Sequence, residues 1–443
     1  MAPSGRFVSD YAGPRDWLEM TKKTGMALGL DNTFQLLKLL DLELSNTTVI
    51  HVAGSNGKGT LCALLATNFT LIGKSNLLFS SPHLCRVEER VRLNGIPVRS
   101  AIFDEAVKKI QFVSLTSNII PTFFEVTFLA AMITASEQNV DFLILETGLG
   151  GRLDATRCAP ADLAILTSIT KEHTDILGDD LNQIIKEKAA IARPGKPIIA
   201  RLMDTVDYQK TVEGVAQNCY QSLIDEKKQP AECYFIDIPD GKTARDEAHI
   251  LAEESLKILN QKSILKDADE LLNWPGRMQR ISLPSGHNII LEAAHNPTGL
   301  EKIIPELIDL ISTEYSTQKT CIVFGTSPQQ DMPAMLNGIA TMCDKIGNVE
   351  LILTKPHGGR YQGVEPLTLL QHPWTVTEIH QYYHVNEALE MLLQREPEKC
   401  GTILVIGSLY LQGNILTYLG LDGDDDLSLI PKDSNVVERS KGD

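Results

Sequence analysis

Apolar positions along the chain follow two patterns, short continuous runs and longer stretches with helical spacing. Continuous runs of this length predict strands that are buried on both faces, as in a parallel sheet. The runs lie at residues 49–52, 75–81, 141–145, 163–169, 197–200 and 233–238. Helical spacing lies at residues 14–45 (interrupted at 29–32), 61–72, 103–112, 122–138 and 181–192. The alternation of strands and helices predicts a doubly wound α/β domain.

The alternation pauses around residues 274–280, WPGRMQR, where we place a domain boundary. We expect a first domain over 1–276 and a smaller α/β domain over 277–421. Its predicted strands are 288–292, 321–325, 351–354 and 402–406, with helices beginning after 298, 331, 385 and 409. The acidic and polar stretch 422–443 is predicted to be a disordered tail.

The stretch 47–60, TTVIHVAGSNGKGT, joins the first strand to the following helix through a glycine-rich turn. Glycines let backbone N–H groups approach phosphate oxygens, and a helix N-terminus adds partial positive charge. Lys58 can reach terminal phosphates, and the Thr60 hydroxyl can ligate Mg²⁺. Gly59 stands between them, unlike the usual nucleotide loop. A turn that only connects two elements is the alternative, and the context favours a phosphate cradle.

Composition limits the class of protein and its partners. The chain of 443 residues has 43% hydrophobic and 22% charged residues, as soluble globular proteins do. Its net charge of −16 argues against nucleic-acid or anionic-membrane partners. The eight scattered cysteines form no CxxC pair, which favours reduced thiols over disulfides or zinc. Without a membrane span or a convincing targeting segment, we expect a cytoplasmic protein, and we expect a monomer.

Polar residues follow several predicted strands where ligands collect in wound sheets. Ser81, Glu146 and His173 each end or follow a different strand, and Thr60 follows the first. Taken singly, Ser81 is an ordinary turn residue and a loop histidine is usually inert. An acid after an apolar run is costly unless it meets a cation. Together, three oxygens and one imidazole would suit Mg²⁺ that borrows phosphate oxygens.

Several segments, in order, resemble the folylpolyglutamate synthase and dihydrofolate synthase family, relatives of the Mur ligases. They are GSNGKGT, SSPHLCRVEERVRLNG, ETGLGGRLDAT, HTDILGDDLNQIIKEKAAIARPG, WPGRMQ and AHNP. This likeness spans roughly residues 25–415, which is more specific than any single loop. The resemblance implies a doubly wound P-loop domain, the Mur-ligase-like ATP-binding domain, followed by a smaller α/β C-terminal domain.

The resemblance assigns roles to residues of this chain. Implied ATP contacts are Gly54, Ser55, Asn56, Gly57, Lys58, Gly59, Thr60, Arg277 and Glu292. Implied Mg²⁺ ligands are Thr60, Ser81, Glu146 and His173, with Lys188 as a carbamylated lysine on a second metal. The implied pterin pocket is Gly29, Leu30, Asp31, Asn32, Thr122, Phe123, Phe124, Glu125, Leu153, Asp154 and Ala155. Implied catalytic residues are Lys58, His173, Lys188 and His295, with Asn296 beside the phosphate and glutamate site. From the residues alone, Lys188 is a solvated helix lysine and the phenylalanines belong to the core.

Some positions depart from the family pattern. Glu292 stands where aspartate is usual, Ala294 where glycine is common, and Ala190 where glycine is expected. The asparagine that contacts ATP on the helix near 245–255 has no clear counterpart, and His249 is not assigned to that role. These changes affect ATP contact more than the reaction.

The resemblance implies an ATP-dependent ligase that joins L-glutamate to dihydropteroate, as a dihydrofolate synthase. GLGGRLDAT, TFFEV and the closing GSLYL segment favour that branch. Addition of glutamate to a reduced folate, or both activities, is the alternative. Two alternatives belong to other functional classes. One is a phosphotransferase or simple NTPase with the same phosphate cradle, and the other is a non-catalytic homologue that acts as a binding protein.

Overall fold

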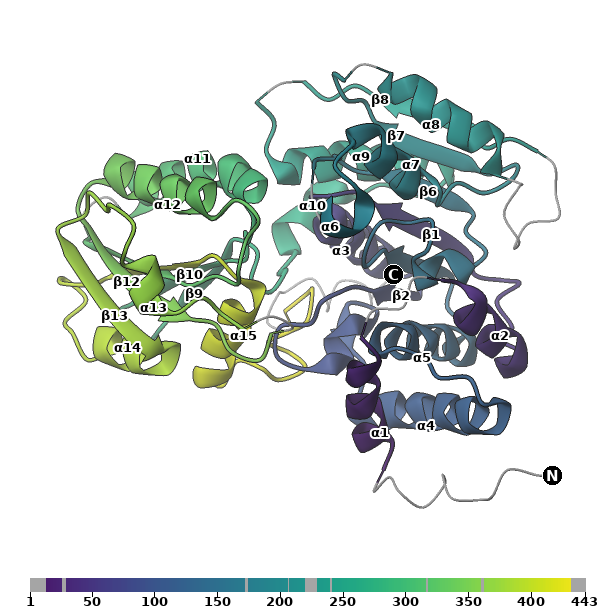
Figure 1. The fold of residues 1–443 in the computed structure, drawn as a ribbon, viewed down its shortest axis with the longest axis horizontal. Coiled ribbons are helices and arrows are strands. Elements are labelled where there is room, and N and C mark those ends of the chain that lie inside the picture. The colour runs from purple at the N-terminus through teal and green to yellow at the C-terminus, as the bar shows by residue number, and fades with distance from the viewer. Residues whose placement is uncertain are drawn as a thin grey trace. The chain divides into compact units, whose positions relative to one another are not determined.

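The computed structural model describes residues 13–25, 29–171, 174–205, 207–219, 229–239, 241–315, 318–359 and 362–431. The chain divides into two compact units, which Figure 1 shows as ribbons. Unit 1 comprises residues 1–83, 87–272 and 429–443, and unit 2 comprises 84–86 and 273–428. The sequence-based boundaries were drawn at 276 and 421. No described helix is long and apolar enough to cross a membrane.

Unit 1 is built on an eight-stranded sheet with the order β4-β3-β2-β5-β1-β6-β7-β8. The strands are β1 Thr48–Ala53, β2 Asn76–Phe79, β3 Val91–Leu93, β4 Ile96–Pro97, β5 Phe142–Glu146, β6 Leu163–Leu166, β7 Pro197–Arg201 and β8 Glu232–Ile236. β2, β5, β1, β6, β7 and β8 are parallel, and the β3–β4 hairpin is antiparallel. The hairpin turns at Asn94 and Gly95, both with positive φ, as Asn-Gly pairs favour.

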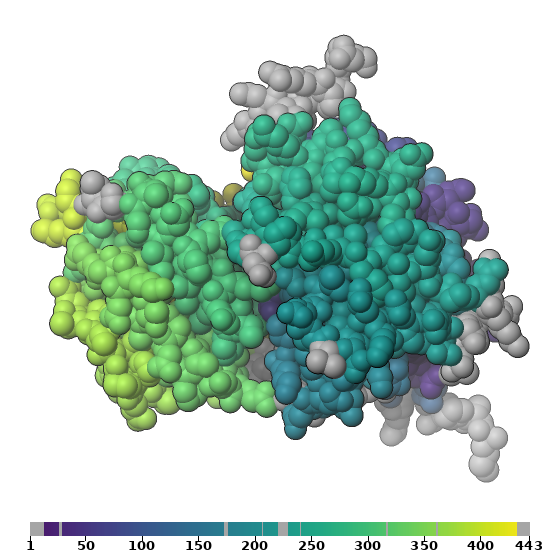
Figure 2. Space-filling model, turned by 90° about the horizontal axis from the view of Figure 1, so that it is seen from above, coloured from purple at the N-terminus to yellow at the C-terminus, as the bar shows by residue number. Residues whose placement is uncertain are grey.

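Helices cover both faces of this sheet. They are α1 Pro14–Thr21, η1 Lys22–Thr24, α2 Asp31–Leu40, α3 Lys58–Leu71, η2 Val87–Arg90, α4 Ser100–Ser117, α5 Phe123–Gln138, η3 Ala155–Cys158, α6 Thr174–Leu177, α7 Leu181–Ala189, α8 Tyr208–Gln217, α9 Ala244–Ile258 and α10 Leu265–Leu271. α5 and α7 pack on the face that carries Val49 and Ala53. α3 contacts β1, β2 and β5 and belongs to neither cluster, so it lies on the face of Ile50 and Val52. The later, teal part of unit 1 forms much of its surface in Figure 2.

The strand order reverses at β1, which lies between β5 and β6. After β1 the chain builds β2 on one side and later β6, β7 and β8 on the other. Such a switch point leaves a crevice at the carboxyl ends of the strands. The 54–60 loop, Glu146 and the residues after Leu166 all lie at those ends.

Unit 2 has a six-stranded sheet with the order β13-β12-β11-β14-β10-β9. Its elements are β9 Gln279–Ser282, β10 Asn288–Glu292, α11 Pro297–Glu314, β11 Thr320–Phe324, α12 Met332–Ile346, β12 Val349–Lys355, α13 Pro366–Leu369, β13 Glu378–His384, α14 Val385–Leu393, β14 Thr402–Ile406 and α15 Leu409–Tyr418. Only β9 is antiparallel among these strands. α11 and α12 cover one face, and α14 and α15 the other. The predicted α/β class is confirmed for both units.

Three local expectations differ from the structure. The first helical stretch ends at Leu40 rather than 45. β9 and β13 were not predicted, because both carry polar residues at alternate or most positions and lie at the sheet edges. Residues 422–431, assigned to a disordered tail, are described in the structure, and both Leu427 and Leu429 are fully buried. Two apolar side chains in an acidic stretch were enough to anchor it. Residues 432–443 lie outside the described residues.

Candidate active site

The glycine turn after β1 begins as a continuation of a fully buried strand. Val52 and Ala53 are buried, and the chain turns at Gly54 and Gly57, whose φ values are 150° and 85°. α3 then begins at Lys58, so the first turn of the helix carries Gly59 and Thr60. Because the first N–H groups of a helix have no partner within it, this turn offers donors and a positive dipole end to an anion.

Residues after β6 hold the turn in place. The Ser55 N–H donates to the Ser168 carbonyl (2.7 Å), and the Thr167 hydroxyl donates to the Asn56 carbonyl (2.7 Å). The Ser55 hydroxyl accepts from the Thr170 N–H at 3.0 Å. A Cβ at Gly54 would lie 1.9 Å from Thr167 Oγ1, so only glycine fits there. The sequence analysis missed this support, although two hydroxyl residues directly after an apolar strand were a usable signal.

Two lysines converge on one carbonyl oxygen of the turn. Lys58 Nζ donates to Gly54 O at 2.8 Å and to Ser55 O at 3.2 Å. Lys188 Nζ, from α7, donates to the same Gly54 O at 2.9 Å. Lys188 is 2% exposed, so it is a buried helix lysine that contacts the turn rather than a solvated one. Lys58, the first residue of α3, adds its positive charge to the positive end of the helix dipole, and both attract a polyanion.

Ser81 and Glu146 meet at the ends of neighbouring strands. The Ser81 N–H donates to Glu146 Oε2 at 3.2 Å, and Glu146 is 6% exposed. Burial raises the pKa of the Cys62 thiol well above its usual value, the negative charge of Glu146 adds to this, and Lys58 opposes it. The carboxylate therefore lies near the first turns of α3, which also carries Thr60.

The donor set around this point fits a Mg²⁺ ion that keeps water and phosphate ligands. Within the described residues no group of three or more His, Cys, Asp or Glu side chains could hold a metal ion. One carboxylate and two hydroxyls are few ligands, and Mg²⁺ is bound in this way when substrate phosphates complete its shell. His173, the fourth predicted ligand, lies outside the described residues.

The N-terminus of α5 forms a second cluster, from residues predicted to line a pterin pocket. Thr122 and Glu125 make a capping box, with the Glu125 N–H donating to Thr122 Oγ1 and the Thr122 N–H to Glu125 Oε2. The Thr33 hydroxyl donates to Glu125 Oε1 at 2.6 Å, which fixes α2 against α5. The Glu125 carboxylate thus organises the cluster, while Phe123 and Phe124 are half-buried.

The loop after β5 packs against this cluster. A Cβ at Gly148 would lie 2.6 Å from the Phe124 ring, so the glycine allows the ring to sit on the backbone. Asp154 accepts from the N–H groups of Gly148 and Leu149, both at 2.9 Å, and from the Thr156 N–H at 3.0 Å. Burial raises the pKa of Asp154, and these hydrogen bonds oppose the shift. Asp154 therefore shapes the loop that carries Leu153, half-buried, and Ala155, buried.

The 29–32 turn lies beside the same cluster. Asn32 Nδ2 donates to the Ile120 carbonyl at 3.3 Å, and Cys158 Sγ lies 3.8 Å from the Leu30 carbonyl. Leu30 packs with Phe123 and Phe124 against the core. Asp31 is exposed and Gly29 half-buried. The structure thus brings three segments of the predicted pocket together within unit 1.

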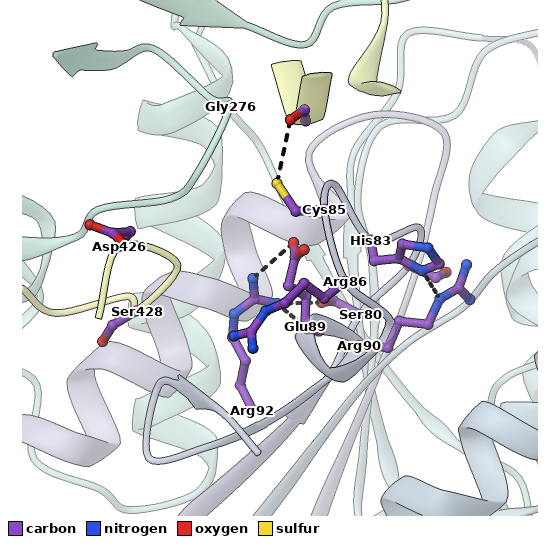
Figure 3. Close-up of polar contacts among 12 residues, drawn as sticks. Ser80, His83, Cys85, Arg86, Glu89, Arg90, Arg92, Gly276, Asp426 and Ser428 are labelled. Carbon is purple, nitrogen blue, oxygen red and sulfur yellow. Dashed lines mark hydrogen bonds and ion pairs between the residues drawn. The ribbon is translucent and has the colours of Figure 1, made fainter. Parts of the chain in front are cut away.

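His83 and Arg90 connect the two clusters. Arg90 Nε donates to His83 Nδ1 at 2.9 Å, as Figure 3 shows. The Arg90 guanidinium lies 5.2 Å from the centre of the Phe123 ring, and Lys22 Nζ lies 4.9 Å from it. Burial and the charges of Arg90 and Lys22 lower the pKa of His83 to about 3. The sequence analysis assigned no role to either cation.

The predicted ATP contacts of unit 2 are Arg277, which precedes β9, and Glu292, the last residue of β10. Glu292 is 3% exposed and accepts from the N–H groups of Met278 (2.9 Å) and Ala294 (2.8 Å). Burial raises its pKa, and Arg277, 3.5 Å away, opposes the shift. Both carboxylate oxygens of Glu292 therefore accept hydrogen bonds from backbone N–H groups of unit 2. Asn296 caps α11 by accepting from the Gly299 N–H, and His295 Nδ1 contacts the Ala293 carbonyl at 2.9 Å.

Known proteins share this sequence and architecture. The Mur ligase middle domain family matches residues 52–228. The dihydrofolate synthase/folylpolyglutamate synthase of Escherichia coli K12 is 31% identical over 324 residues, which cover 68% of this chain and 74% of that protein. Escherichia coli FolC in complex with DHPP and ADP superposes with a TM-score of 0.76 at 24% identity, over 92% of this chain and 98% of that one. A bifunctional folylpolyglutamate synthase/dihydrofolate synthase with Mn, AMPPNP and L-glutamate bound has a TM-score of 0.74 at 26% identity, over 93% and 98%.

Proposed function

This chain belongs to the dihydrofolate synthase/folylpolyglutamate synthase family, and on that premise we propose that it is a dihydrofolate synthase. It is an ATP-dependent ligase of acids and amino acids, and the substrates we assign are 7,8-dihydropteroate and L-glutamate. One observation carries the site: Lys58, the first residue of α3, donates to Gly54 O and Ser55 O, so its charge lies beside the N-terminal N–H groups of the helix. That arrangement suits a bound triphosphate.

In the proposed reaction, a carboxylate oxygen of dihydropteroate attacks the γ-phosphorus of ATP, and ADP leaves. The glutamate nitrogen then attacks the carbonyl carbon of the acyl phosphate, loses a proton, and phosphate departs. Lys58 and the N–H groups of α3 hold the phosphates in line, since phosphoryl transfer depends on alignment and charge neutralisation. Bound Mg²⁺ would supply further charge neutralisation, and Thr60, Ser81, Glu146 and His173 would hold it. Arg277, Glu292 and His295 are assigned to the nucleotide and glutamate from unit 2.

Lys188 is assigned as a carbamylated lysine. Lys188 Nζ is buried and donates to the same Gly54 oxygen as Lys58 Nζ, at the turn that would hold the phosphates. Reaction of the neutral amine with CO₂ gives a carboxylate-like group, which could ligate a second metal ion. The mass of the intact protein would report this addition, and loss of the adduct in Lys188→Arg would locate it.

The pterin ring is assigned to the cluster around Phe123, Phe124 and the 29–32 turn. Phe124 offers a half-buried aromatic face, supported by Gly148 and by the Asp154 loop. GLGGRLDAT and TFFEV, the segments that favour dihydropteroate, supply this cluster. The protein names of the relatives include both activities, so a reduced folate as second acceptor is the alternative outcome of the assay.

The decisive experiment measures ADP release with glutamate and either dihydropteroate or tetrahydrofolate. We expect ADP release that depends on both dihydropteroate and glutamate, and less with tetrahydrofolate. Equal rates with both acceptors would indicate a bifunctional enzyme. ADP release without glutamate would indicate a phosphotransferase or NTPase, and no ADP release would indicate a binding protein. We place the enzyme in the cytoplasm, where its thiols, none of which forms a disulfide in the described structure, would stay reduced.

A further inference from the structure

Two buried cysteines of unit 2 face each other at the start of neighbouring strands. Cys321 is the second residue of β11, and Cys400 lies in the turn between α14 and β14. β11 and β14 pair in parallel, with Thr320 opposite Thr402. Both cysteines are fully buried, and their Sγ atoms lie 2.6 Å apart. Packing of the turn before β14 against the start of β11 therefore holds the two sulfurs together.

At this separation the two sulfurs need to move only a short distance to form a disulfide bond. A disulfide bond is about 2.05 Å long, and pairs are bridged without backbone movement when their Cα atoms are about 4.4–6.8 Å apart. The remaining approach of the two sulfurs is a fraction of an ångström, within the reach of side-chain rotation.

The surroundings of the two thiols differ. Contact with the Cys321 thiol is the main cause that lowers the pKa of Cys400, and the Arg395 charge also lowers it, against the effect of burial. The same contact and burial raise the pKa of Cys321. Arg395 is held by Glu350, with Nη1 and Oε2 2.7 Å apart. Thiol–disulfide exchange begins with a thiolate, so Cys400 is the sulfur that would react first.

We propose that Cys321 and Cys400 form a reversible disulfide in the presence of a small-molecule disulfide. The Cys400 thiolate attacks one sulfur of the reagent and releases one small thiolate. Cys321 then loses its proton, attacks Sγ of Cys400, and releases the second small thiolate. Two protein thiols and one reagent disulfide thus become one protein disulfide and two small thiols. The reagent enters when the turn around Cys400 opens locally, without global unfolding.

A bridge at this position would cross-link β11 to β14 and enclose the elements between them. The closed loop contains α12, β12, α13, β13 and α14. Closing so long a loop restricts the unfolded chain, which stabilises unit 2 against unfolding. The oxidised protein should therefore unfold at a higher temperature than the reduced protein.

The test uses the full-length protein, reduced, desalted and then incubated with oxidised glutathione a few degrees below its unfolding midpoint. Remaining thiols are alkylated, and the digested protein is analysed by mass spectrometry. We expect a Cys321–Cys400 cross-linked peptide, a mass lower by about 2 Da, and a midpoint higher by about 5 °C that dithiothreitol reverses.

Matched variants separate this pair from the other buried thiols. Cys343→Ser removes a buried thiol of unit 2 whose pKa burial raises to about 12, and it should leave the cross-link intact. Cys400→Ser should abolish it. Eight alkylated thiols after the incubation, glutathione adducts alone, or a native cross-link between other cysteines would each overturn the proposal. None of these outcomes depends on enzymatic activity, so the proposal stands apart from the proposed function.

Discussion

Replacement of Gly54 by alanine tests whether contact with Thr167 sets the conformation of the glycine turn after β1. The new Cβ would lie 1.9 Å from Thr167 Oγ1, and the backbone there has a φ of 150°. A side chain in this region costs of order 1–3 kcal/mol. Moving Thr167 also breaks its hydrogen bond to Asn56 O, which is worth about 1 kcal/mol. We therefore expect the free energy of unfolding to fall by about 2–4 kcal/mol.

Urea denaturation measures this loss, and calorimetric titration with a non-hydrolysable ATP analogue measures the binding that goes with it. We expect the affinity of Gly54→Ala to fall at least about tenfold, equivalent to 1.4 kcal/mol. Adding Thr167→Ala to this variant removes the closest contact. The double variant should therefore lose less stability than the sum of the two single variants, and the difference is the coupling energy. Gly214→Ala in α8, where the Cβ meets nothing within 4 Å, is the control and should be neutral or stabilising. Wild-type stability and affinity in Gly54→Ala would refute the reasoning.

Three further predictions follow from the same structure. Lys58→Ala should lower turnover about a hundredfold or more with the urea midpoint retained, and near-normal turnover would count against the phosphate site. Burial, Arg193 and Arg157 lower the pKa of His51, so below pH 6.5 the unfolded chain binds a proton that the folded chain excludes. The free energy of unfolding should fall by up to about 1.4 kcal/mol per pH unit there, and less in His51→Gln, with His249→Gln as control. Ending the chain after residue 421 removes the buried Leu427 and Leu429 and should lower the unfolding free energy by about 2–5 kcal/mol per leucine, whereas ending it after 431 should not.

Strands and helices with strong patterns were predictable because burial on both faces leaves a continuous apolar run. β1, β5 and β6 are fully buried apart from the half-buried first residue of β1, and their positions agree with the sequence runs within a few residues. β13 has only exposed and half-buried residues, so its sequence EIHQYYH carries no such run. Its place is set by pairing with β12, a contact between segments far apart in the chain. Local patterns therefore reveal central strands better than edge strands.

The sequence indicated which residues could take part in binding or catalysis, but it did not show which groups each of them contacts. Asp154 and Glu125 look like ligand-binding acids in sequence, yet their described hydrogen bonds go to N–H and hydroxyl groups of the protein itself. Glu292 is used in the same way in unit 2. A buried carboxylate needs several donors, and the nearest donors are usually backbone N–H groups. Whether such an acid binds a ligand or a loop depends on contacts that no local pattern contains.

The conformation of the 54–60 turn could not be predicted from its own sequence. Strand, glycines, lysine and helix are evident in the 47–60 segment, but the orientation of its carbonyls depends on the Thr167 and Ser168 hydroxyls and on Lys188. Two of these follow β6 and one lies on α7, over a hundred residues along the chain. A turn with the same sequence but apolar residues at 167 and 168 would keep its strand and helix. It would lose the fixed backbone on which an anion site depends, because preorganised donors bind phosphate only when something else holds them still.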